Sequence, residues 1–182
     1  MPMIDVTIPE GVLKPEAEDR LMKELTDILI KAEGYSADNK AAQSVTWLFL
    51  HYTAKLYQAG ERAKTPRYRI VPTVPEGQYN DANREFLVKE CTEAVVRAAG
   101  EDARKYVWVF PTEMPDGHWG AQGRILRLPE IHAMLQAGEK DRKAGQDDLK
   151  DGAERLAKHR RVKALEVMAG AFDAVQKGSA AE

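Results

Sequence analysis

Pro2 is the residue of this sequence best suited to chemistry, because removal of Met1 would make it the amino terminus. A terminal proline is a secondary amine, and it is held more rigidly than the amine of a lysine side chain. Residues 4–8 alternate between apolar and polar, which predicts a strand that buries one face. An amine at the start of a buried strand is partly desolvated. Desolvation lowers the pKa of an amine and favours the neutral form that a general base requires.

Other side chains could bind a substrate beside such an amine. Arg69 and Arg124 are candidates for a substrate carboxylate, because the guanidinium fork can bond both carboxylate oxygens. Arg124 is preferred, since it lies with Trp119 on a glycine-rich loop, and solvation at the surface is the alternative for either arginine. His51 ends a predicted strand and could donate a proton, and a structural role explains it equally well. His118 is a loop residue that could serve the site or be exposed in a turn.

The composition argues against several other classes of function. The net charge is −2, which gives no reason to expect nucleic acid or a membrane as a partner. The four histidines and the single cysteine, Cys91, show no metal-ligand spacing. Residues 120–123 are glycine-rich but do not open a helix, as a dinucleotide-binding loop would. No metal or cofactor is therefore expected, and the lone cysteine, with no signal-peptide pattern, predicts a cytoplasmic protein.

The elements that must position these residues are repeated along the chain. Residues 7–11 (TIPEG) return as residues 73–77 (TVPEG), 66 residues later. At the same offset and without gaps, residues 21–34 align with residues 87–100, with six of fourteen positions identical. Two copies of one structural unit are therefore predicted.

Each copy has the pattern of a strand, a helix and a second strand. A right-handed parallel crossover is the usual form of such a unit. We therefore expect an α+β fold in which a duplicated β-α-β unit gives a four-stranded sheet with two helices on one face. The predicted elements are a strand at 4–8, a helix between Pro15 and Gly34, a strand at 44–52, a strand at 67–74, a helix capped by Asn80 or Asp81, and a strand at 105–112.

The second strand of each copy is rich in apolar residues. The strand at 44–52 is nearly all apolar, which predicts burial on both of its faces. Trp47 and its counterpart Trp108 are accordingly expected in the core. Two helices cover only one face of the sheet, so association of several chains is expected to cover the other. Pro72 and Pro111 lie within predicted strands and are expected at edges or bulges.

The repeat also suggests how the chain is divided. Residues 1–130 are predicted to form one domain, with copies at 1–60 and 67–130. Residues 131–182 have no counterpart in the repeat and are predicted to form a helical C-terminal extension. Within it, residues 153–177 carry apolar side chains at helical spacing, as if for a partner.

The motifs together resemble the tautomerase superfamily. Pro2 before a strand, the Pro-Glu-Gly turn, and residues 112–120 (TEMPDGHWG) are similar to 4-oxalocrotonate tautomerase. The duplicated length and Trp108-Val109-Phe110 are more like fused members such as cis-3-chloroacrylic acid dehalogenase. The resemblance covers roughly residues 2–130. It implies a β-α-β duplication, a homotrimer, and an amino-terminal proline that acts as catalytic base or acid.

The resemblance implies active-site roles for some residues of this chain, while other active-site positions of the superfamily carry different residues here. Pro2 matches the catalytic proline, and Trp119 matches an aromatic residue that makes the active site apolar. The arginine that often follows the Pro-Glu-Gly turn is replaced by Val12 and, in the second copy, by Gln78. Trp108 stands where 4-oxalocrotonate tautomerase has an arginine, which makes Trp108 a candidate substrate-binding residue.

Comparison with two other members tests narrower activities. The substrate-binding arginines of the dehalogenase fall on Pro75 and Gln78, which argues against its chemistry here. Asp38 aligns with the acidic residue of malonate semialdehyde decarboxylase, whose arginines fall on Gly77 and Tyr79. Asp38 is therefore a further candidate site residue, and decarboxylation is a minor alternative.

These observations predict a cofactor-independent tautomerase or isomerase. Pro2 would be general base or acid on a small enol or keto acid, a carboxylate or carbonyl compound. One alternative is a non-catalytic binding or assembly protein that keeps the fold, motivated by the missing arginines. A proline-dependent hydratase or decarboxylase is another.

Overall fold

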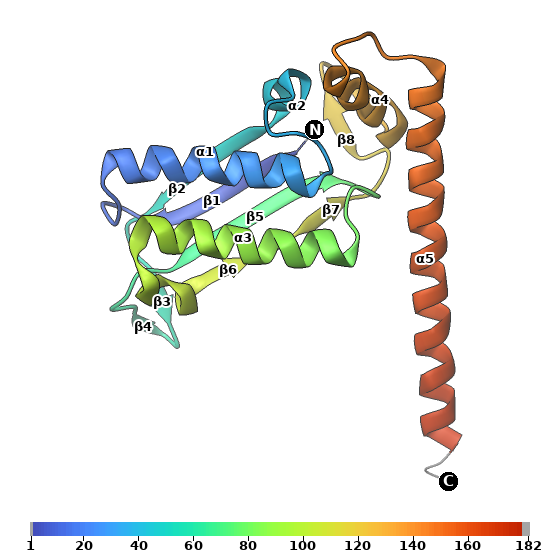
Figure 1. Cartoon of the computed structure of the whole chain (residues 1–182). Coiled ribbons are helices and arrows are strands. Elements are labelled where there is room, and N and C mark those ends of the chain that lie inside the picture. The colour runs from blue at the N-terminus through green and yellow to red at the C-terminus, as the bar shows by residue number, and fades with distance from the viewer. Residues whose placement is uncertain (1, 180–182) are drawn as a thin grey trace.

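The structure, a computed structural model that describes residues 2–179, is built on one mixed β-sheet (Figure 1). The strand order is β2-β1-β5-β6, and β7 pairs with β5 beyond the end of β6. β1 is parallel to β2 and antiparallel to β5, while β6 and β7 are both parallel to β5. The strands are β1 (Met3–Pro9), β2 (Trp47–Thr53), β5 (Tyr68–Pro75), β6 (Val107–Val109) and β7 (Thr112–Met114).

Two long helices, α1 (Pro15–Ala32) and α3 (Asp81–Ala99), cover one face of this sheet. Each helix follows the first strand of its copy and leads toward the second. α1 begins at a proline, whose missing N–H group costs nothing in the first turn. α3 is capped reciprocally by Asn80 and Asn83, with N–O distances of 2.8 and 3.3 Å. The predicted α+β fold with duplicated β-α-β units is therefore confirmed.

The core lies between the sheet and these helices. Ile4, Val6 and Ile8 of β1 are each only 1% exposed, which matches their alternation in the sequence. They pack against the apolar stripe of α1, which includes Leu21 and Leu25. The second copy contributes the corresponding residues Ile70, Val74, Leu87, Cys91 and Val95.

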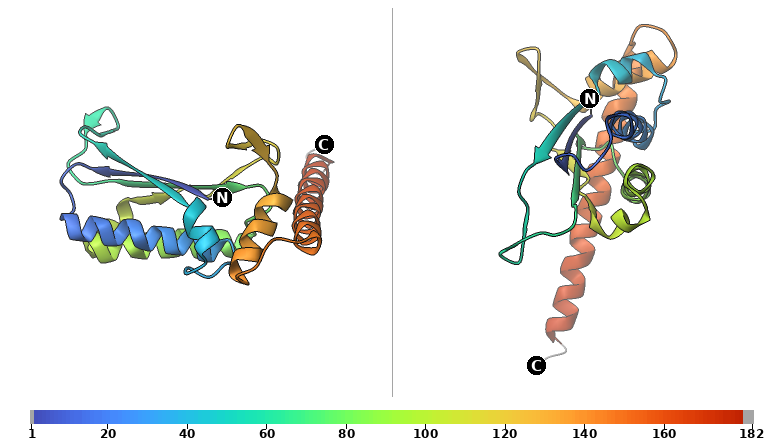
Figure 2. Two further views of the ribbon diagram at one scale, coloured as in Figure 1. Left: turned by 90° about the horizontal axis from the view of Figure 1, so that it is seen from above. Right: turned by 90° about the vertical axis from the view of Figure 1, so that its left-hand side faces the viewer.

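The opposite face of the sheet is open in the single chain (Figure 2). Trp47 is 63% exposed and Trp108 is 69% exposed, with Phe49 and Phe110 beside them at 44% and 43%. The expectation that these tryptophans lie in the core, on strands buried on both faces, is wrong for the single chain. The alternate residues Leu48 and Leu50 do contact the core. Both faces are apolar in sequence, but the helices cover only one.

The last strand of the sheet is broken at the prolines. Phe110 and Pro111 separate β6 from β7, opposite the part of β5 that contains Pro72. Because Pro72 has no N–H group, it cannot donate to a neighbouring strand at this point. Pro111 therefore lies in a break, as expected, whereas Pro72 lies in a central strand and not at an edge.

Short elements fill the connections. The predicted polar segment before β2 contains a short helix, α2 (Lys40–Val45), and a 3-10 helix, η1 (Glu101–Tyr106), precedes β6. Two hairpins lie outside the main sheet. They are β3 (Tyr57–Gln58) with β4 (Glu61–Arg62), and β8 (Trp119–Ala121) with β9 (Arg124–Leu126).

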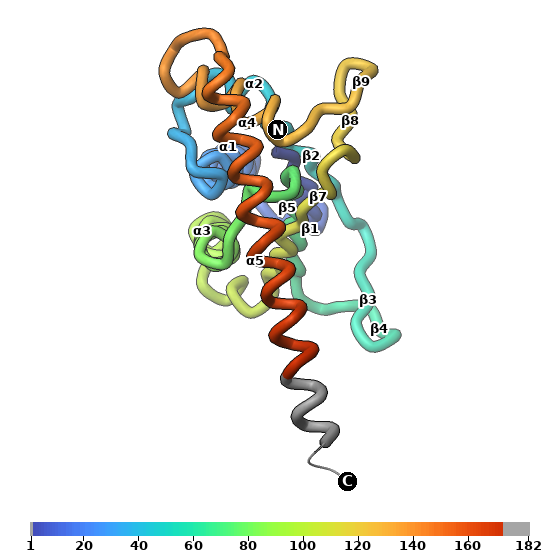
Figure 3. The backbone as a smooth tube through the Cα atoms, turned by 90° about the vertical axis from the view of Figure 1, so that its right-hand side faces the viewer, coloured from blue at the N-terminus to red at the C-terminus, as the bar shows by residue number. Residues whose placement is uncertain are grey.

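The C-terminal part is helical, as predicted, and it builds a second apolar cluster against the first copy. α4 (Leu128–Glu139) packs its Ile131 and Leu135 against Ile30 and Tyr35. α5 (Gln146–Ser179) first packs along α4 and then projects away from the sheet (Figure 3). Its projecting half exposes the apolar side chains of Leu165, Met168 and Phe172. Within residues 2–179, no helix combines the length and the apolar character needed to cross a membrane.

Candidate functional site

A pocket of about 580 Å³ lies at the start of β1. Pro2 is buried in its wall, and the Pro2 carbonyl accepts a hydrogen bond from the N–H of Trp47 at 3.3 Å. The parallel register of β1 and β2 places Met3 beside Trp47, and the antiparallel register of β1 and β5 places Met3 beside Thr73. The first residues of the chain therefore meet the start of β2 and the end of β5 at one point.

The walls of this pocket are mostly apolar. Met3, Val45, Trp47, Met114 and Trp119 contribute apolar or aromatic surface. The polar side chains that line the pocket are Ser44, Thr73, His118 and Gln122.

Two of the polar side chains differ in what they can offer to a ligand. The Ser44 hydroxyl already donates to the carbonyl of Ala41 at 2.8 Å. Thr73 lines the pocket and is only 8% exposed, so little solvent competes with a ligand at this residue. Such groups can polarise a carbonyl oxygen without adding charge to the pocket.

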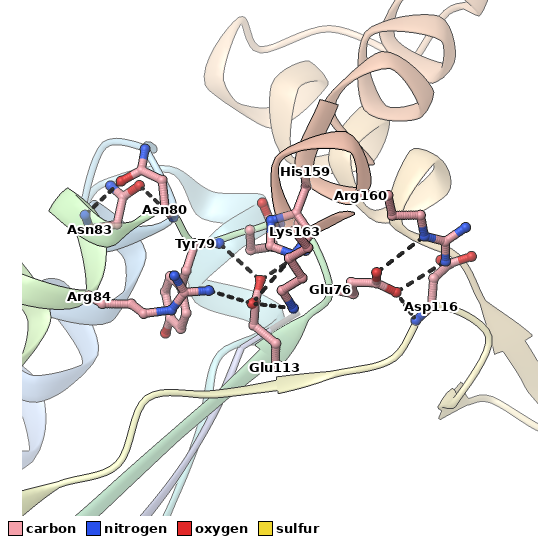
Figure 4. Close-up of polar contacts among 12 residues, drawn as sticks. Glu76, Tyr79, Asn80, Asn83, Arg84, Glu113, Asp116, His159, Arg160 and Lys163 are labelled. Carbon is pink, nitrogen blue, oxygen red and sulfur yellow. Dashed lines mark hydrogen bonds and ion pairs between the residues drawn. The ribbon is translucent and has the colours of Figure 1, made fainter. Parts of the chain in front are cut away.

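The loop that carries His118 and Trp119 is tied to α5. Glu76 accepts hydrogen bonds from the Asp116 N–H at 3.0 Å and from Arg160 on α5 at 3.2 and 3.1 Å (Figure 4). These bonds hold the pKa of the Glu76 carboxyl at about 2, with the bond from Arg160 as the largest cause. The Asp116 carboxylate in turn accepts from the N–H of Leu128 and from Arg127, both at 2.9 Å. α5 therefore helps to position one wall of the pocket.

Glu113 joins α5 to the turn after β5. Its Oε1 accepts from the N–H groups of Gly77 and Tyr79 at 2.9 and 3.4 Å, and its Oε2 accepts from Arg84 at 2.7 Å. Lys163 and His159 of α5 lie 3.6 and 3.7 Å from the same Oε2 atom (Figure 4). The neighbouring residue Met114 lines the pocket, so this ion cluster fixes the strand end beside Pro2.

A buried polar cluster lies under α4 and α5. The Tyr35 hydroxyl is 2.8 Å from Nδ1 of His132, and burial lowers the pKa of that histidine. Arg155 donates to the carbonyls of Gly77 and Gln78 at 2.9 and 2.8 Å. Neither carboxylate oxygen of Glu33 has a hydrogen-bond partner among residues 2–179, and burial raises the pKa of that carboxyl.

The structure brings together two of the seven residues that the sequence suggested for the site. Pro2 and Trp119 both line the pocket. The other five lie outside it. Trp108 is exposed on the open face of the sheet and packs edge-on against Phe110, with ring centroids 6.2 Å apart.

The two candidate arginines are engaged elsewhere. Arg124 forms an ion pair with Glu130 at 2.9 Å. The guanidinium of Arg69 lies 5.8 Å from the centroid of the Phe110 ring, on the open face of the sheet. Neither side chain lines the pocket.

His51 and Asp38 are also distant from Pro2 in the fold. His51 pairs with Asp5 at 2.8 Å, and its strand position is opposite Thr7, four residues along β1 from Met3. Asp38 is hydrogen-bonded to Ser36 in the loop before α2.

Several lining residues were not suggested by the sequence. Trp47 was expected in the core, and Ser44, Thr73, Met114 and Gln122 were not among the candidate site residues. The register of β1 could have indicated Trp47 and Thr73, because both face Met3 across neighbouring strands. His118 was considered, and it lines the pocket from an exposed position.

Comparisons with known proteins agree with this fold. Residues 73–128 match the family model described as "Tautomerase enzyme". A search of the curated proteins found no match. The crystal structure of Pt0534 inactivated by 2-oxo-3-pentynoate is similar, with a TM-score of 0.57 and 20% identity over 68% of this chain and 94% of that one.

Two further structures illustrate the range of the likeness. A wild-type fused 4-OT, an asymmetric trimer, has a TM-score of 0.55 and 20% identity over 68% of this chain and 94% of that one. Macrophage migration inhibitory factor of Toxoplasma gondii has a TM-score of 0.55 and 15% identity over 68% and 99% of the two chains. At such identities the likeness concerns the fold.

Proposed function

We propose that this chain is a cofactor-independent tautomerase of the tautomerase superfamily, a proposal supported by the family match of residues 73–128 and by the fold. Pro2, exposed by removal of Met1, is the general base and acid in this proposal. The observation that carries it is the position of Pro2, which is buried in the wall of a pocket that β1, β2, β5 and β7 build together.

In the proposed reaction, the Pro2 nitrogen accepts a proton from an enol hydroxyl and returns a proton to a carbon of the conjugated system. The Thr73 hydroxyl and the Gln122 amide line the same pocket and are suited to hydrogen-bond the oxygen that carries the developing negative charge. Apolar walls from Trp47, Met114 and Trp119 favour a neutral amine, because desolvation disfavours its ammonium form.

The decisive experiment compares the wild-type protein with Pro2→Ala in the ketonisation of simple enols. Intact mass spectrometry first establishes that Met1 is absent from the purified wild-type protein. We expect the variant to lose about 100-fold or more in kcat/KM, the usual contribution of a general base. Pro66→Ala, at an exposed proline between the copies, is the control and should keep the wild-type rate. Equal rates for wild type and Pro2→Ala would exclude Pro2 as the base.

We also propose that the chain assembles as a homotrimer through the open face of the sheet. Trp47, Phe49, Trp108 and Phe110 expose aromatic surface on this face, and large exposed apolar patches are typical of interaction sites. The fused 4-OT structure is described as a trimer, which supports the same arrangement here.

A non-catalytic assembly protein is the second candidate. The observation in its favour is that Arg69 and Arg124 are bound to Phe110 and Glu130 and do not line the pocket. The ketonisation experiment separates the two proposals, because an assembly protein would show no difference in rate from a buffer control.

A further inference from the structure

The projecting half of α5 carries its apolar side on the outside of the molecule. Lys163 lies on the side of α5 that faces the sheet, and its Nζ atom is 3.6 Å from Oε2 of Glu113 (Figure 4). Each residue advances by about 100° around a helix, so Leu165, Met168 and Phe172 lie about 140–200° from Lys163. These three side chains, termed the outer stripe here, are 65%, 55% and 66% exposed. An amphipathic helix usually buries its apolar side against its own domain, and this one turns it away.

The described part of the chain does not cover the outer stripe. Every residue from 164 to 172 is exposed, and no other segment comes within 4 Å of the point where a Cβ atom on Gly170 would stand. A helix without tertiary packing is marginal in water, and a glycine in its interior weakens it further. We therefore expect this half of α5 to pack against another molecule.

The residues around the outer stripe indicate what kind of surface it meets. Alanines flank it on both sides, at Ala164, Ala169 and Ala171. Glu166 is the only charged residue between 164 and 172, and its position on the helix is on the side of Lys163. Apolar residues spaced by three and four, with small and uncharged neighbours, are typical of a helix that packs closely along a second helix.

From this pattern we infer that the outer stripe pairs with the outer stripe of a second copy of the chain, with the two α5 helices antiparallel. The distribution of charge supports this occupant and this direction. Residues 158–163 include four lysines and arginines, whereas residues 164–176 include two acidic residues and no basic one. A parallel pair would bring two basic segments together. An antiparallel pair places each basic segment toward the acidic segment of the other copy, and such complementarity selects the partner.

The size of the contact indicates that several pairs act together. The part of α5 from residue 163 to residue 179 is about 25 Å long. A contact about 25 Å long and about 10 Å wide buries less than the ~1,200 Å² of a stable interface, so one pair should not hold two separate copies together. In the proposed trimer, three such helices are linked, and linkage strengthens weak contacts. Three-fold trimers joined by two-fold helix pairs can close as a hexamer. The inference extends the proposed trimer and is independent of the chemistry of Pro2.

Size-exclusion chromatography with light scattering tests the pairing on the full chain. Leu165→Glu places a charge on the outer stripe. Val167→Glu is the matched control, because Val167 is 73% exposed on the same helix but lies about 40° from Lys163, away from the stripe. We expect the wild type and Val167→Glu to have twice the mass of Leu165→Glu, with equal helix content by circular dichroism. A wild type no heavier than Leu165→Glu would overturn the inference and leave the proposed trimer in place. Equal losses in both variants would also overturn it, since the added charge and not the stripe would be responsible.

A mixing experiment identifies the occupant of the stripe. In the antiparallel pair, Met168 of one copy meets Phe172 of the other. Met168→Glu and Phe172→Lys are purified separately, and each alone should have half the wild-type mass. Their mixture should recover the full mass, because the introduced acid meets the introduced base at one contact and the native pair remains at the other. If mixing restores nothing although each substitution halves the mass, the stripe binds a different surface and the inference fails.

Discussion

Arg160 on α5 contacts both carboxylate oxygens of Glu76, at 3.2 and 3.1 Å, and Glu76 in turn accepts the N–H of Asp116. This chain of bonds links the C-terminal helix to the loop that carries His118 and Trp119. The helix is therefore part of the structure that shapes the pocket, although the repeat does not include it.

The first prediction concerns this ion pair. The pKa of Glu76 is lowered from its usual value to about 2, so the pair contributes stability above pH 4.5 that is lost as the pH falls through about 2. We expect Arg160→Ala to lower the free energy of unfolding by about 0.5–1 kcal/mol at pH 7 and to have little effect at pH 2. Urea unfolding at both pH values measures this difference.

A control for Arg160→Ala is available next to it. Arg161 is exposed on the same helix, so Arg161→Ala removes the same charge without touching Glu76. Equal destabilisation by the two variants would mean that net charge, and not the ion pair, is responsible.

The second prediction concerns Glu33. Its carboxyl group is fully buried without a hydrogen-bond partner among residues 2–179, and burial raises its pKa. A raised pKa contributes stability that is present below pH 4.5 and is lost as the pH rises through the folded value. We expect Glu33→Gln, which resembles the protonated acid, to be more stable than wild type by about 1–3 kcal/mol at pH 8. Thermal unfolding between pH 4 and 8 should show the gap widening with pH, and a destabilised variant would contradict this account.

The third prediction concerns the Tyr35–His132 pair under α4. Burial lowers the pKa of His132, so its contribution to stability is present above pH 6.5 and is lost as the pH falls toward the lower folded value. We expect stability to decline below pH 6.5 in the wild type and this part of the decline to vanish in His132→Gln. His51→Gln, at an exposed histidine, should keep the decline, and a decline that persisted in His132→Gln would assign it to other groups.

The sequence predicted the sheet and its two helices because the repeat identified both copies at once. It also suggested Pro2, from its place before a strand, and Trp119, from the resemblance to the tautomerase superfamily, and both line the pocket. The exposure of Trp47 could not be predicted from the sequence, because a run of apolar residues indicates a strand but does not show whether one face or both faces of its sheet are covered. The single chain covers one face, and Trp47 lies on the other.

The arginines show a second limit of sequence reasoning. Arg124 follows the pocket residue Gln122 closely in the sequence, but its side chain forms an ion pair with Glu130, six residues later at the start of α4. The direction of the Arg124 side chain therefore depends on a contact that spacing in the sequence does not show. The start of α5 depends similarly on a contact that spacing does not reveal. Arg142 binds Asp148 in two bonds of 2.6 Å, and the N–H of Gly145 donates to the same carboxylate, so the helix begins before the predicted residue 153.

The fourth prediction concerns assembly. Trp108 is exposed on the open face of the sheet, and Leu165 is exposed on the projecting half of α5. If the sheet face forms the proposed trimer, Trp108→Glu should shift the protein to monomer in size-exclusion chromatography with light scattering. Leu165→Glu should leave the trimer intact. The reverse result would place the contact between copies on α5.

The last prediction concerns the acidity of the proposed base. Trp119 lines the pocket with Pro2 and is half-buried, so its indole helps to keep water from the amine. In Trp119→Ala, we expect greater hydration to favour the ammonium form and to move the acidic limb of the kcat/KM profile to higher pH, toward the usual value of about 8 for a terminal amine. The control is Ile125→Ala, at an exposed residue of the same hairpin, which should leave the profile in place. A Trp119→Ala profile that fell in rate without moving on the pH axis would show that the indole packs against the substrate and does not tune the amine.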